Sequence, residues 1–215
     1  MQFYGYFRSS ASYRCRIAFN LKDMDYEFTS IHLRRNGGEH KTAEYLDANP
    51  QGLVPTLIDD EVTIGQSLAI IEWLDEKFPE PALLPSDVND KARVRAFAQI
   101  IACDIHPLQN LRVLQYLKNT YDADQDALDA WCQAWLGDGL AACEALVARA
   151  DHGGAYCFGD TPGLADICLV PQIASAHRFK VDLSGMPNLV RIHNACQQLP
   201  AFAAAAPDQQ PDAEA

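Results

Sequence analysis

The residues with the clearest chemical potential are three closely spaced serines, Ser9, Ser10 and Ser12. An apolar, aromatic run at residues 3–7 predicts a strand before them, and apolar residues four apart over 13–21 predict a helix after them. The serines therefore lie where a strand turns into a helix, whose first N–H groups lack partners and carry the positive end of the helix dipole. A hydroxyl there either caps the helix or holds an anion against those N–H groups.

A helix cap needs one of these serines, so the whole group calls for a further explanation. Arg8, Arg14 and Arg16 surround the serines, in a chain whose formal net charge is −12. A basic cluster with several hydroxyls in an otherwise acidic chain predicts a seat for an anion. A thiolate is one candidate for that anion.

Composition sets limits on the class of protein. The chain has 215 residues, of which 48% are hydrophobic, which predicts one large or two small globular domains. The acidic balance argues against nucleic acid and anionic membranes as partners, because both require a basic surface. No apolar run approaches the roughly 20 residues of a membrane span, and the chain starts with a strand pattern where a targeting peptide would stand. We therefore expect a soluble, cytoplasmic protein.

The seven cysteines and six histidines show no ligand pattern. The cysteine count is odd, the spacing is scattered, and neither C-x-x-C nor H-E-x-x-H occurs. We expect no disulfide framework and no metal site, with most cysteines acting as small buried hydrophobes.

The first part of the chain has the pattern of a small α/β domain. A second strand over 25–33 predicts a parallel β-α-β unit with the first. A short helix over 42–48, a hairpin of 56–58 with 62–64, and a helix opening at Gln66-Ser67 follow. Pro55 stands directly before the hairpin, where a cis Val54–Pro55 bond would turn the Val54 backbone toward a ligand. Ser67 places a second hydroxyl at a second helix N-terminus.

A proline-rich stretch, residues 78–87, marks a domain boundary, and only helices are predicted after it. They cover about 89–119 with a kink at Pro107, 124–150, 163–179, 188–198 and 201–206. Cys103, His106 and Asn110 would share one face of the first, Trp131 and Trp135 would lie in the core of the second, and Asp166 would bond back to the N-cap of the third. The tail, 207–215, is predicted to fray.

Several blocks in one order then resemble a known family. They are Arg8–Arg14, Asn49–Gln51, Val54–Leu57, Gln66–Glu72, Asp104–Leu111, Gly159-Asp160, Leu164–Asp166, Leu169–Gln172 and Arg178–Leu183. Together they resemble the glutathione transferases, most closely the zeta class, which includes maleylacetoacetate isomerase and the related maleylpyruvate isomerase. The resemblance implies a thioredoxin-like, glutathione-binding α/β domain at residues 1–80 and an all-helical, substrate-binding domain at 88–208.

The same resemblance implies roles for single residues. Ser9 would lie beside the glutathione sulfur, with Ser10 and Arg8 completing the catalytic group. The residues implied to bind glutathione are Ser9, Ser10, Ala11, Ser12, Tyr13, Arg14, His40, Val54, Gln66, Ser67, His106, Asn110, Leu111 and Arg112. Arg8 and Arg178 would bind the carboxylates of a small diacid substrate.

The implied activity is a glutathione-dependent cis–trans isomerisation of maleylacetoacetate in aromatic amino-acid breakdown, by a homodimer. Maleylpyruvate in gentisate breakdown is the alternative substrate, and conjugation or dehalogenation is the alternative chemistry. Leu111, where the maleylpyruvate branch can carry Arg, favours maleylacetoacetate, whereas 130–132 and 158–162 look more like the maleylpyruvate branch. Ala11, where the family commonly has Cys, removes any role for that thiol, and the absence of Cys from residues 9–12 argues against a glutaredoxin-type reductase. A non-catalytic interaction protein would not need Ser9, Gln66 and Ser67 together.

Overall fold

A computed structural model describes residues 1–150 and 153–214, and the chain divides into two compact units. The first unit comprises Met1–Leu83 together with Gln198–Ala215, and the second comprises Leu84–Gln197. The sequence-based boundary at 208 differs from this division, because the last segment of the chain packs with the first unit. Within the described residues, no helix is both long and apolar enough to cross a bilayer.

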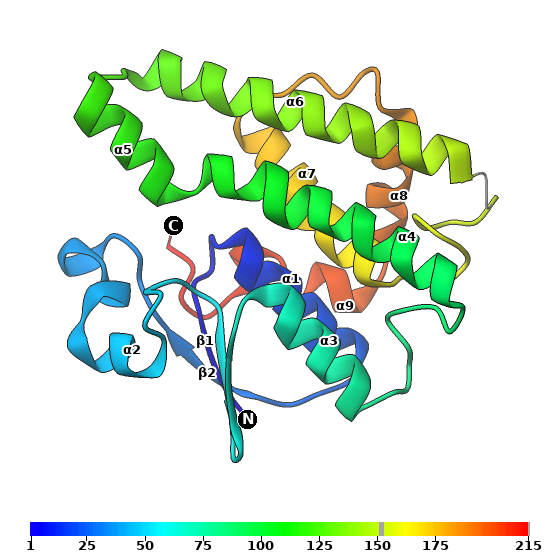
Figure 1. Ribbon diagram of the computed structural model, residues 1–215, viewed down its shortest axis with the longest axis horizontal. Helices are drawn as coiled ribbons and strands as arrows, with labels where there is room; N and C mark the ends of the chain where they lie inside the picture. The colour runs from blue at the N-terminus through cyan, green and yellow to red at the C-terminus, as the bar shows by residue number, and fades with distance from the viewer. Residues whose placement is uncertain (151–152, 215) are drawn as a thin grey trace. The chain divides into compact units, whose positions relative to one another are not determined.

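The first unit is built on a four-stranded sheet in the order β2-β1-β3-β4. β1 and β2 lie side by side in this sheet (Figure 1). The strands are β1 (Gln2–Gly5), β2 (Glu27–Ser30), β3 (Thr56–Asp59) and β4 (Val62–Gly65). β1 runs parallel to β2, with Phe3 opposite Phe28, while β3 is antiparallel to both β1 and β4. The parallel pair and the hairpin predicted from the sequence are both confirmed.

Helices cover both faces of this sheet. They are α1 (Ser10–Leu21), α2 (Ala43–Ala48) and α3 (Ser67–Lys77), with the short α9 (Pro200–Ala203) from the end of the chain. Phe3 packs on Phe19 of α1 with ring centroids 5.1 Å apart, while Tyr4 packs on Tyr45 of α2 at 5.9 Å. Because successive strand residues point to opposite faces, α1 and α2 lie on opposite sides of the sheet. α3 and α9 both pack against α1, which completes a thioredoxin-like arrangement.

A buried lysine ties the end of α3 to the segment that follows it. Lys22 Nζ donates to Asp75 Oδ1 at 2.8 Å, to the Phe78 carbonyl at 2.6 Å and to the Pro81 carbonyl at 2.7 Å. These three acceptors satisfy the three N–H groups of an ammonium that is 6% exposed as a residue. Two proline bonds in this unit are cis, Val54–Pro55 as predicted and Glu80–Pro81, which the sequence analysis did not single out.

The second unit is a helical bundle around α7 (Leu164–Arg178). Every residue of α7 from Leu164 to Ile173 is buried. α7 packs against α4 (Val88–Gln99), α6 (Gln125–Ala150) and α8 (Pro187–Gln197), and α5 (Leu111–Tyr121) packs against α6. A helix that is buried on all sides is expected to be mainly apolar, and the two polar residues in this stretch, Asp166 and Gln172, are both hydrogen-bonded.

The single kinked helix predicted over 89–119 is instead a succession of segments. α4 passes into a π-helical stretch, Ile100–Ile105, and a 3-10 turn, His106–Gln109, before α5 begins. Pro107 supplies no N–H to continue an α-helix, and Asn110 has an extended backbone with a ψ of 144° and caps α5. Cys103, His106 and Asn110 therefore do not share one helical face, and that prediction was wrong.

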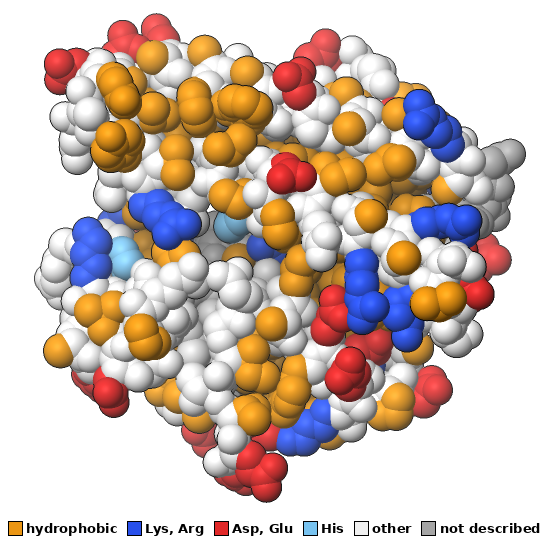
Figure 2. Space-filling model, in the orientation of Figure 1, with side chains coloured by type: hydrophobic (Ala, Val, Ile, Leu, Met, Phe, Trp, Pro, Cys, Tyr) orange, Lys and Arg blue, Asp and Glu red, His pale blue; other side chains and the backbone are white. Residues whose placement is uncertain are grey.

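Hydrophobic side chains gather on the surface over α5 and α6 (Figure 2). Tyr116 and Tyr121 of α5 and Trp135 of α6 are the large exposed ones there. Trp135 is 44% exposed and lies edge-on to the half-buried Trp131, whose Nε1 donates to the Leu108 carbonyl at 2.8 Å. The prediction that both tryptophans lie in the core was therefore wrong for Trp135.

We expect the replacement Asp166→Ala to lower the free energy of unfolding by about 2 to 4 kcal/mol. Asp166 is 2% exposed, and its carboxylate accepts from the N–H groups of Gly163 and Cys157, both at 2.9 Å. The bond from the Gly163 N–H is the predicted one between Asp166 and the N-cap of α7. Without Asp166, the N–H groups of Gly163 and Cys157 both lose their acceptor. Urea unfolding measures the loss, and the exposed Asp160→Ala is the control, expected to change stability by less than about 0.5 kcal/mol. Equal stability of the two variants would contradict this account of Asp166.

We also expect stability to fall as the pH drops from about 6.5 toward 4, with part of the fall due to His193. Burial, and secondarily the charge of His177, lowers the pKa of His193 to about 4. The unfolded chain binds the proton at a higher pH than the folded chain, so the stability from neutral His193 is complete above the unfolded pKa and lost below it. Urea midpoints across this pH range should decline less steeply for His193→Gln than for the wild type. Identical slopes would contradict the prediction.

Candidate active site

The turn between β1 and α1 places Ser9 at the N-terminus of the helix. Ser9 is the N-cap of α1, and its Oγ accepts from the Ser12 N–H at 3.1 Å. The hydroxyl proton of Ser9 is not used in that bond, because a hydroxyl both accepts and donates. Capping and anion binding, the two readings of this serine, are therefore compatible in one residue.

Residues 10–13, which follow Ser9, differ in how exposed their side chains are. Ser12 is fully buried, and its Oγ accepts from the Tyr6 N–H at 3.3 Å. Tyr13 is 3% exposed, and its hydroxyl donates to the Phe202 carbonyl at 3.5 Å. Ala11 is also buried, whereas Ser10 is half-buried. Of the predicted contacts on this turn, the hydroxyls of Ser9 and Ser10 are thus the more accessible ones.

A fully buried arginine braces the backbone of the same turn. Arg16 donates from Nε to the Ala205 carbonyl at 2.9 Å, from Nη1 to the Tyr6 carbonyl at 3.4 Å and from Nη2 to the Phe7 carbonyl at 3.1 Å. The sequence analysis noted its charge but not this role, since Ala205 is remote in sequence. Arg8, one residue beyond the braced carbonyls, is exposed, with its guanidinium 5.3 Å from the centre of the Phe7 ring.

A second helix N-terminus is fastened to the first through Arg14. Arg14 is 3% exposed, and its Nε donates to Ser67 Oγ at 3.0 Å. Ser67 is the first residue of α3, and the neighbouring Cys15 of α1 contacts its carbonyl. Because Ser67 Oγ accepts from Arg14, its own proton is oriented away from the guanidinium. The two predicted hydroxyl sites thus belong to one rigid pair of helices.

Gln66, the N-cap of α3, has an unusual backbone. Its φ is +67° and its ψ is 116°, a conformation that costs a non-glycine residue energy. Its Nε2 donates to Gln51 Oε1 at 2.8 Å, which links α3 to the loop before β3. Backbone strain at a residue with a predicted binding role strengthens that prediction.

The loop before β3 is held from inside by two side chains. Asn49 Nδ2 donates to the Leu53 carbonyl at 2.8 Å, and the Tyr45 hydroxyl donates to the same carbonyl at 2.7 Å. Both side chains also reach Thr56 Oγ1, at 2.9 Å each. Val54 lies between these anchored positions. Among the described residues, none hydrogen-bonds to its N–H or C=O.

His40 lies next to this loop. Its carbonyl oxygen would lie 3.1 Å from a Cβ placed on Gly52, and Gly52 has a φ of +61°. The His40 ring stacks over Gly38, where a Cβ would overlap it. Burial lowers the pKa of His40, and its Nδ1 is buried with no partner among the described residues. The structure thus places His40 beside Gly38 and Gly52, next to the loop before β3.

The remaining predicted residues belong to the second unit. Asn110 Oδ1 accepts from the Arg112 N–H at 3.2 Å and so caps α5, whose first residue is Leu111. His106 begins the 3-10 turn, and Arg178 ends α7 with its guanidinium 5.1 Å from the centre of the Phe179 ring. The structure therefore links Arg14 with Ser67, and Gln66 with the loop before β3, within the first unit. The predicted residues His106, Asn110, Leu111, Arg112 and Arg178 belong to the second unit.

Two hydrogen bonds fasten segments next to these residues to different faces of α6, because residues two apart on a helix do not face the same way. Trp131 of α6 donates to Leu108, in the 3-10 turn of His106, and Gln133 Nε2 donates to the Phe179 carbonyl, next to Arg178, at 2.9 Å. Gln109 Nε2 also donates to Gln172 Oε1 of α7 at 3.2 Å. Gly139 of α6 allows the close approach, because a Cβ there would overlap the Ile105 side chain.

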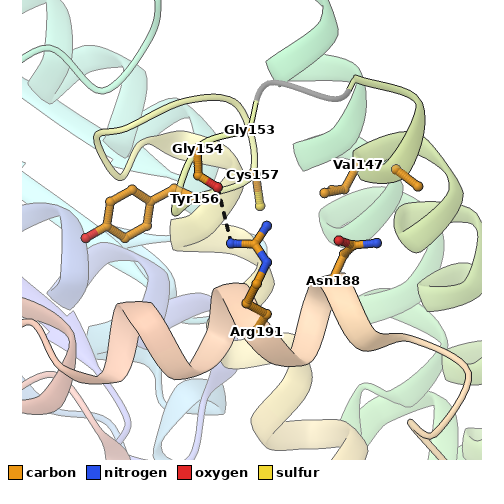
Figure 3. A pocket seen from close by; sticks show the side chains of 8 residues that line it. Val147, Gly153, Gly154, Tyr156, Cys157, Asn188 and Arg191 are labelled. Atoms are coloured by element: carbon orange, nitrogen blue, oxygen red, sulfur yellow. Dashed lines mark hydrogen bonds between the residues drawn. The ribbon is translucent and has the colours of Figure 1, made fainter.

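A cavity of about 440 Å³ lies elsewhere in the second unit. It is bounded by the end of α6, the 153–157 loop and α8, and Arg191 reaches across it to the Gly154 carbonyl at 3.2 Å (Figure 3). None of the predicted site residues lines it. The cavity is therefore separate from the candidate site.

The cysteines do not provide the anion that this site would hold. All seven are free thiols and six are buried. Burial raises the pKa of Cys132 to about 11 and that of Cys143 to about 12, so these thiols stay protonated at neutral pH. Within the described residues, no group of three or more His, Cys, Asp or Glu is placed to hold a metal ion.

Comparison with known proteins matches the chain to two family models. Residues 3–82 match the glutathione S-transferase N-terminal domain, and residues 112–204 match the glutathione S-transferase C-terminal domain. The chain is 49% identical over 212 residues to a maleylpyruvate isomerase of a Ralstonia species, covering 99% of both chains. It is 47% identical over 216 residues to a maleylacetoacetate isomerase of Pseudomonas aeruginosa, covering 100% of both.

Solved structures agree with these matches. A bacterial zeta-class glutathione S-transferase described as the holo form of maleylpyruvate isomerase superposes with a TM-score of 0.96 at 48% identity, with both chains fully covered. A maleylacetoacetate isomerase of Methylobacterium extorquens AM1 with bound malonate and glutathione superposes with a TM-score of 0.95 at 35% identity, also with full coverage of both chains. With close relatives along its whole length, and the two helix N-termini in place, the chain belongs to the zeta class of the glutathione S-transferase family.

Proposed function

We propose that this chain is a glutathione-dependent cis–trans isomerase of a maleyl diacid. Maleylacetoacetate is the main candidate substrate and maleylpyruvate the alternative, since relatives named for each are almost equally similar to the chain. The observation that carries the proposal is the Ser9 hydroxyl, which caps α1 and keeps its proton for an anion. The malonate bound with glutathione in a relative supports a small dicarboxylate as the substrate class.

The residues present fit glutathione as the cofactor. Ser9 and Ser10 would hold the sulfur at the N-terminus of α1, and Ser67, fixed by Arg14, would hold the γ-glutamyl carboxylate at the N-terminus of α3. Gln66 would contact the same end of the tripeptide. The backbone of Val54 would pair with its middle, and His40 would lie at its glycyl end.

When bound, glutathione supplies a thiolate that adds reversibly to the cis double bond, so that the bond rotates and re-forms as trans when the thiolate leaves. The residues of the chain keep that sulfur ionised. A hydroxyl donor at a helix N-terminus favours thiolate over thiol. Lowering a thiol pKa by about two units requires roughly 2.7 kcal/mol, which a few oriented dipoles can supply.

Other residues would bind the substrate. Arg8 and Arg178 would pair with its carboxylates, because a guanidinium binds a carboxylate through two parallel hydrogen bonds. The same charges would stabilise enolate character during addition. By resemblance to the family, residues 1–80 would form the glutathione-binding domain, and His106, Asn110, Leu111 and Arg112 of the helical domain, residues 88–208, would also bind glutathione. The protein would act as a cytoplasmic homodimer in the breakdown of aromatic compounds.

The direct test is turnover of maleylacetoacetate and of maleylpyruvate, each with and without glutathione. We expect trans product from at least one of them, only with glutathione, and glutathione should be recovered unchanged. The ratio of the two kcat/KM values assigns the physiological substrate. Consumption of glutathione with haloacids or other electrophiles, and no isomerisation, would replace the proposal by conjugation or dehalogenation.

For Ser9→Ala, we expect kcat to fall by about 100-fold or more, with glutathione still bound. The loss of the helix cap should in addition lower the free energy of unfolding by about 1 kcal/mol. Ser9→Thr is the matched control, because it keeps a hydroxyl both for the cap and for the sulfur. Stopped-flow isomerisation measures kcat, a calorimetric titration measures glutathione binding, and urea unfolding measures the loss of the cap. Wild-type turnover by Ser9→Ala would remove Ser9 from the mechanism.

A further inference from the structure

The end of the chain is anchored beside the β1–α1 turn, although the sequence predicts that residues 207–215 fray. Asp212 Oδ2 accepts from the Phe7 N–H at 3.1 Å and from Ser30 Oγ at 2.7 Å. Upstream of it, Pro207–Gln209 form a 3-10 turn, and the Gln210 amide donates to the carbonyls of Ala204 and Ala206, both at 2.9 Å. The prediction of a frayed tail was therefore wrong for its described residues.

Asp212 supplies a hydrogen-bond acceptor that a longer β2 would otherwise supply to β1. The parallel ladder of β1 and β2 continues to the bond from the Ile31 N–H to the Gly5 carbonyl, at 2.7 Å. The register makes the Phe7 N–H the next donor toward β2. That N–H donates to Asp212 Oδ2 instead. The same oxygen accepts from the hydroxyl of Ser30, the last residue of β2. The final rung beside the turn is thus supplied by the C-terminal segment.

A second carboxylate fastens the tail two residues later. His32 Nδ1 accepts from the backbone N–H groups of Arg34 and Arg35, at 3.2 Å and 2.7 Å. An imidazole nitrogen that accepts is unprotonated, so Nε2 carries the proton and donates to Glu214 Oε1 at 3.0 Å. Arg35 Nη2 donates to the same oxygen at 3.2 Å. Because Glu214 is half exposed, we assign the main effect on the turn to Asp212.

The C-terminal segment also contacts the buried brace of the turn. Arg16 donates to the Ala205 carbonyl as well as to those of Tyr6 and Phe7. Burial lowers the pKa of Arg16 to about 10, and the charge of Asp212 is among the influences that raise it. The Tyr6–Phe7 backbone is therefore held on its carbonyl side by Arg16 and on its N–H side by Asp212.

We propose that the C-terminal segment holds the β1–α1 turn in its active geometry, with Asp212 as the positioning residue that fixes the turn carrying Arg8 and Ser9. Asp212 touches neither substrate nor sulfur in this role. It sets the backbone from which the Ser9 hydroxyl and the Arg8 guanidinium project. The inference rests on the proposed roles of those two residues.

The test compares Asp212→Ala and Asp212→Asn with Asp208→Ala. Asp208 is an exposed aspartate of the same tail, so its replacement removes the same charge without touching the turn. Three quantities are measured on the full chain: hydrogen exchange at the Phe7 amide, the pH midpoint of the bound glutathione thiolate by its ultraviolet absorbance, and the kcat and KM of isomerisation.

For Asp212→Ala we expect faster exchange at Phe7 and a kcat lower by about 10-fold to 100-fold, because a small misplacement of catalytic groups has effects of that size. We also expect the thiolate midpoint to move to higher pH, against the lowering that the loss of a nearby negative charge would cause by itself. Asp208→Ala should stay within about 2-fold of the wild type. Asp212→Asn, with one acceptor oxygen left, should lie between them, and it preserves the test if the alanine variant does not fold.

Two outcomes would overturn the proposal. One is unchanged exchange at Phe7. The other is faster exchange with the thiolate midpoint and kcat of the Asp208→Ala control, which would make Asp212 a structural residue only. If the wild type isomerises neither maleyl substrate, the proposed function fails, while the thiolate midpoint and the exchange at Phe7 still decide the role of Asp212.

Discussion

The candidate site depends on the burial of one guanidinium. Arg16 is 0% exposed and donates to three backbone carbonyls, and among the described residues no carboxylate lies within ion-pair distance of it. A buried charge without such partners would be very costly, so the three carbonyls must keep their positions for the fold to be stable. Two of them belong to Tyr6 and Phe7, directly before Arg8 and Ser9. The backbone directly before Arg8 and Ser9 is therefore held in place by buried hydrogen bonds from Arg16.

Buried hydrogen bonds also hold the two helix N-termini of the first unit in fixed positions. The end of a helix binds an anion well only when its direction is fixed. Arg14 connects α1 to Ser67 of α3 by a buried hydrogen bond, and Gln66 connects α3 to the loop before β3. Tyr45 and Asn49 then hold that loop at Leu53. The predicted contacts at Ser67 and at the loop before β3 are thus each fixed by a neighbouring side chain.

The sequence was a good guide wherever the signal is local. Periodicity and turn residues predict the strands, the hairpin and most of the helices, because neighbouring residues determine them. Pro107 predicts a disturbance, but the choice among a kink, a π-helical stretch and a new helix capped by Asn110 depends on packing against α6, where Gly139 gives room to Ile105. The exposure of Trp135 is likewise a tertiary property that spacing does not contain.

The parts of the site that the sequence missed are those made by residues remote from each other. The bond between Phe7 and Asp212 joins positions 205 apart in a tail whose composition is typical of a frayed end. In a parallel sheet, an N–H group beyond the last paired residue requires an acceptor, but pairing rules do not say which segment supplies it. The residue pattern predicted Ser9 and Ser67 as site residues and the family resemblance added Gln66, but neither gave any indication of Asp212 or of the bracing role of Arg16.

The net negative charge of the chain does not prevent a predicted anion site, because charges on the surface act only over a short range. At physiological ionic strength a surface charge is screened over about 8 Å, so the net charge of −12 has little influence inside a turn lined by fixed dipoles. Arg8, Arg14 and Arg16 act there at short range, two of them buried. Asp212 lies among these basic residues and accepts hydrogen bonds from the Phe7 N–H and the Ser30 hydroxyl. Its negative charge raises the pKa of Arg16. An acidic protein can thus carry a locally basic turn, with Asp212 serving there as the acceptor for the Phe7 N–H and the Ser30 hydroxyl.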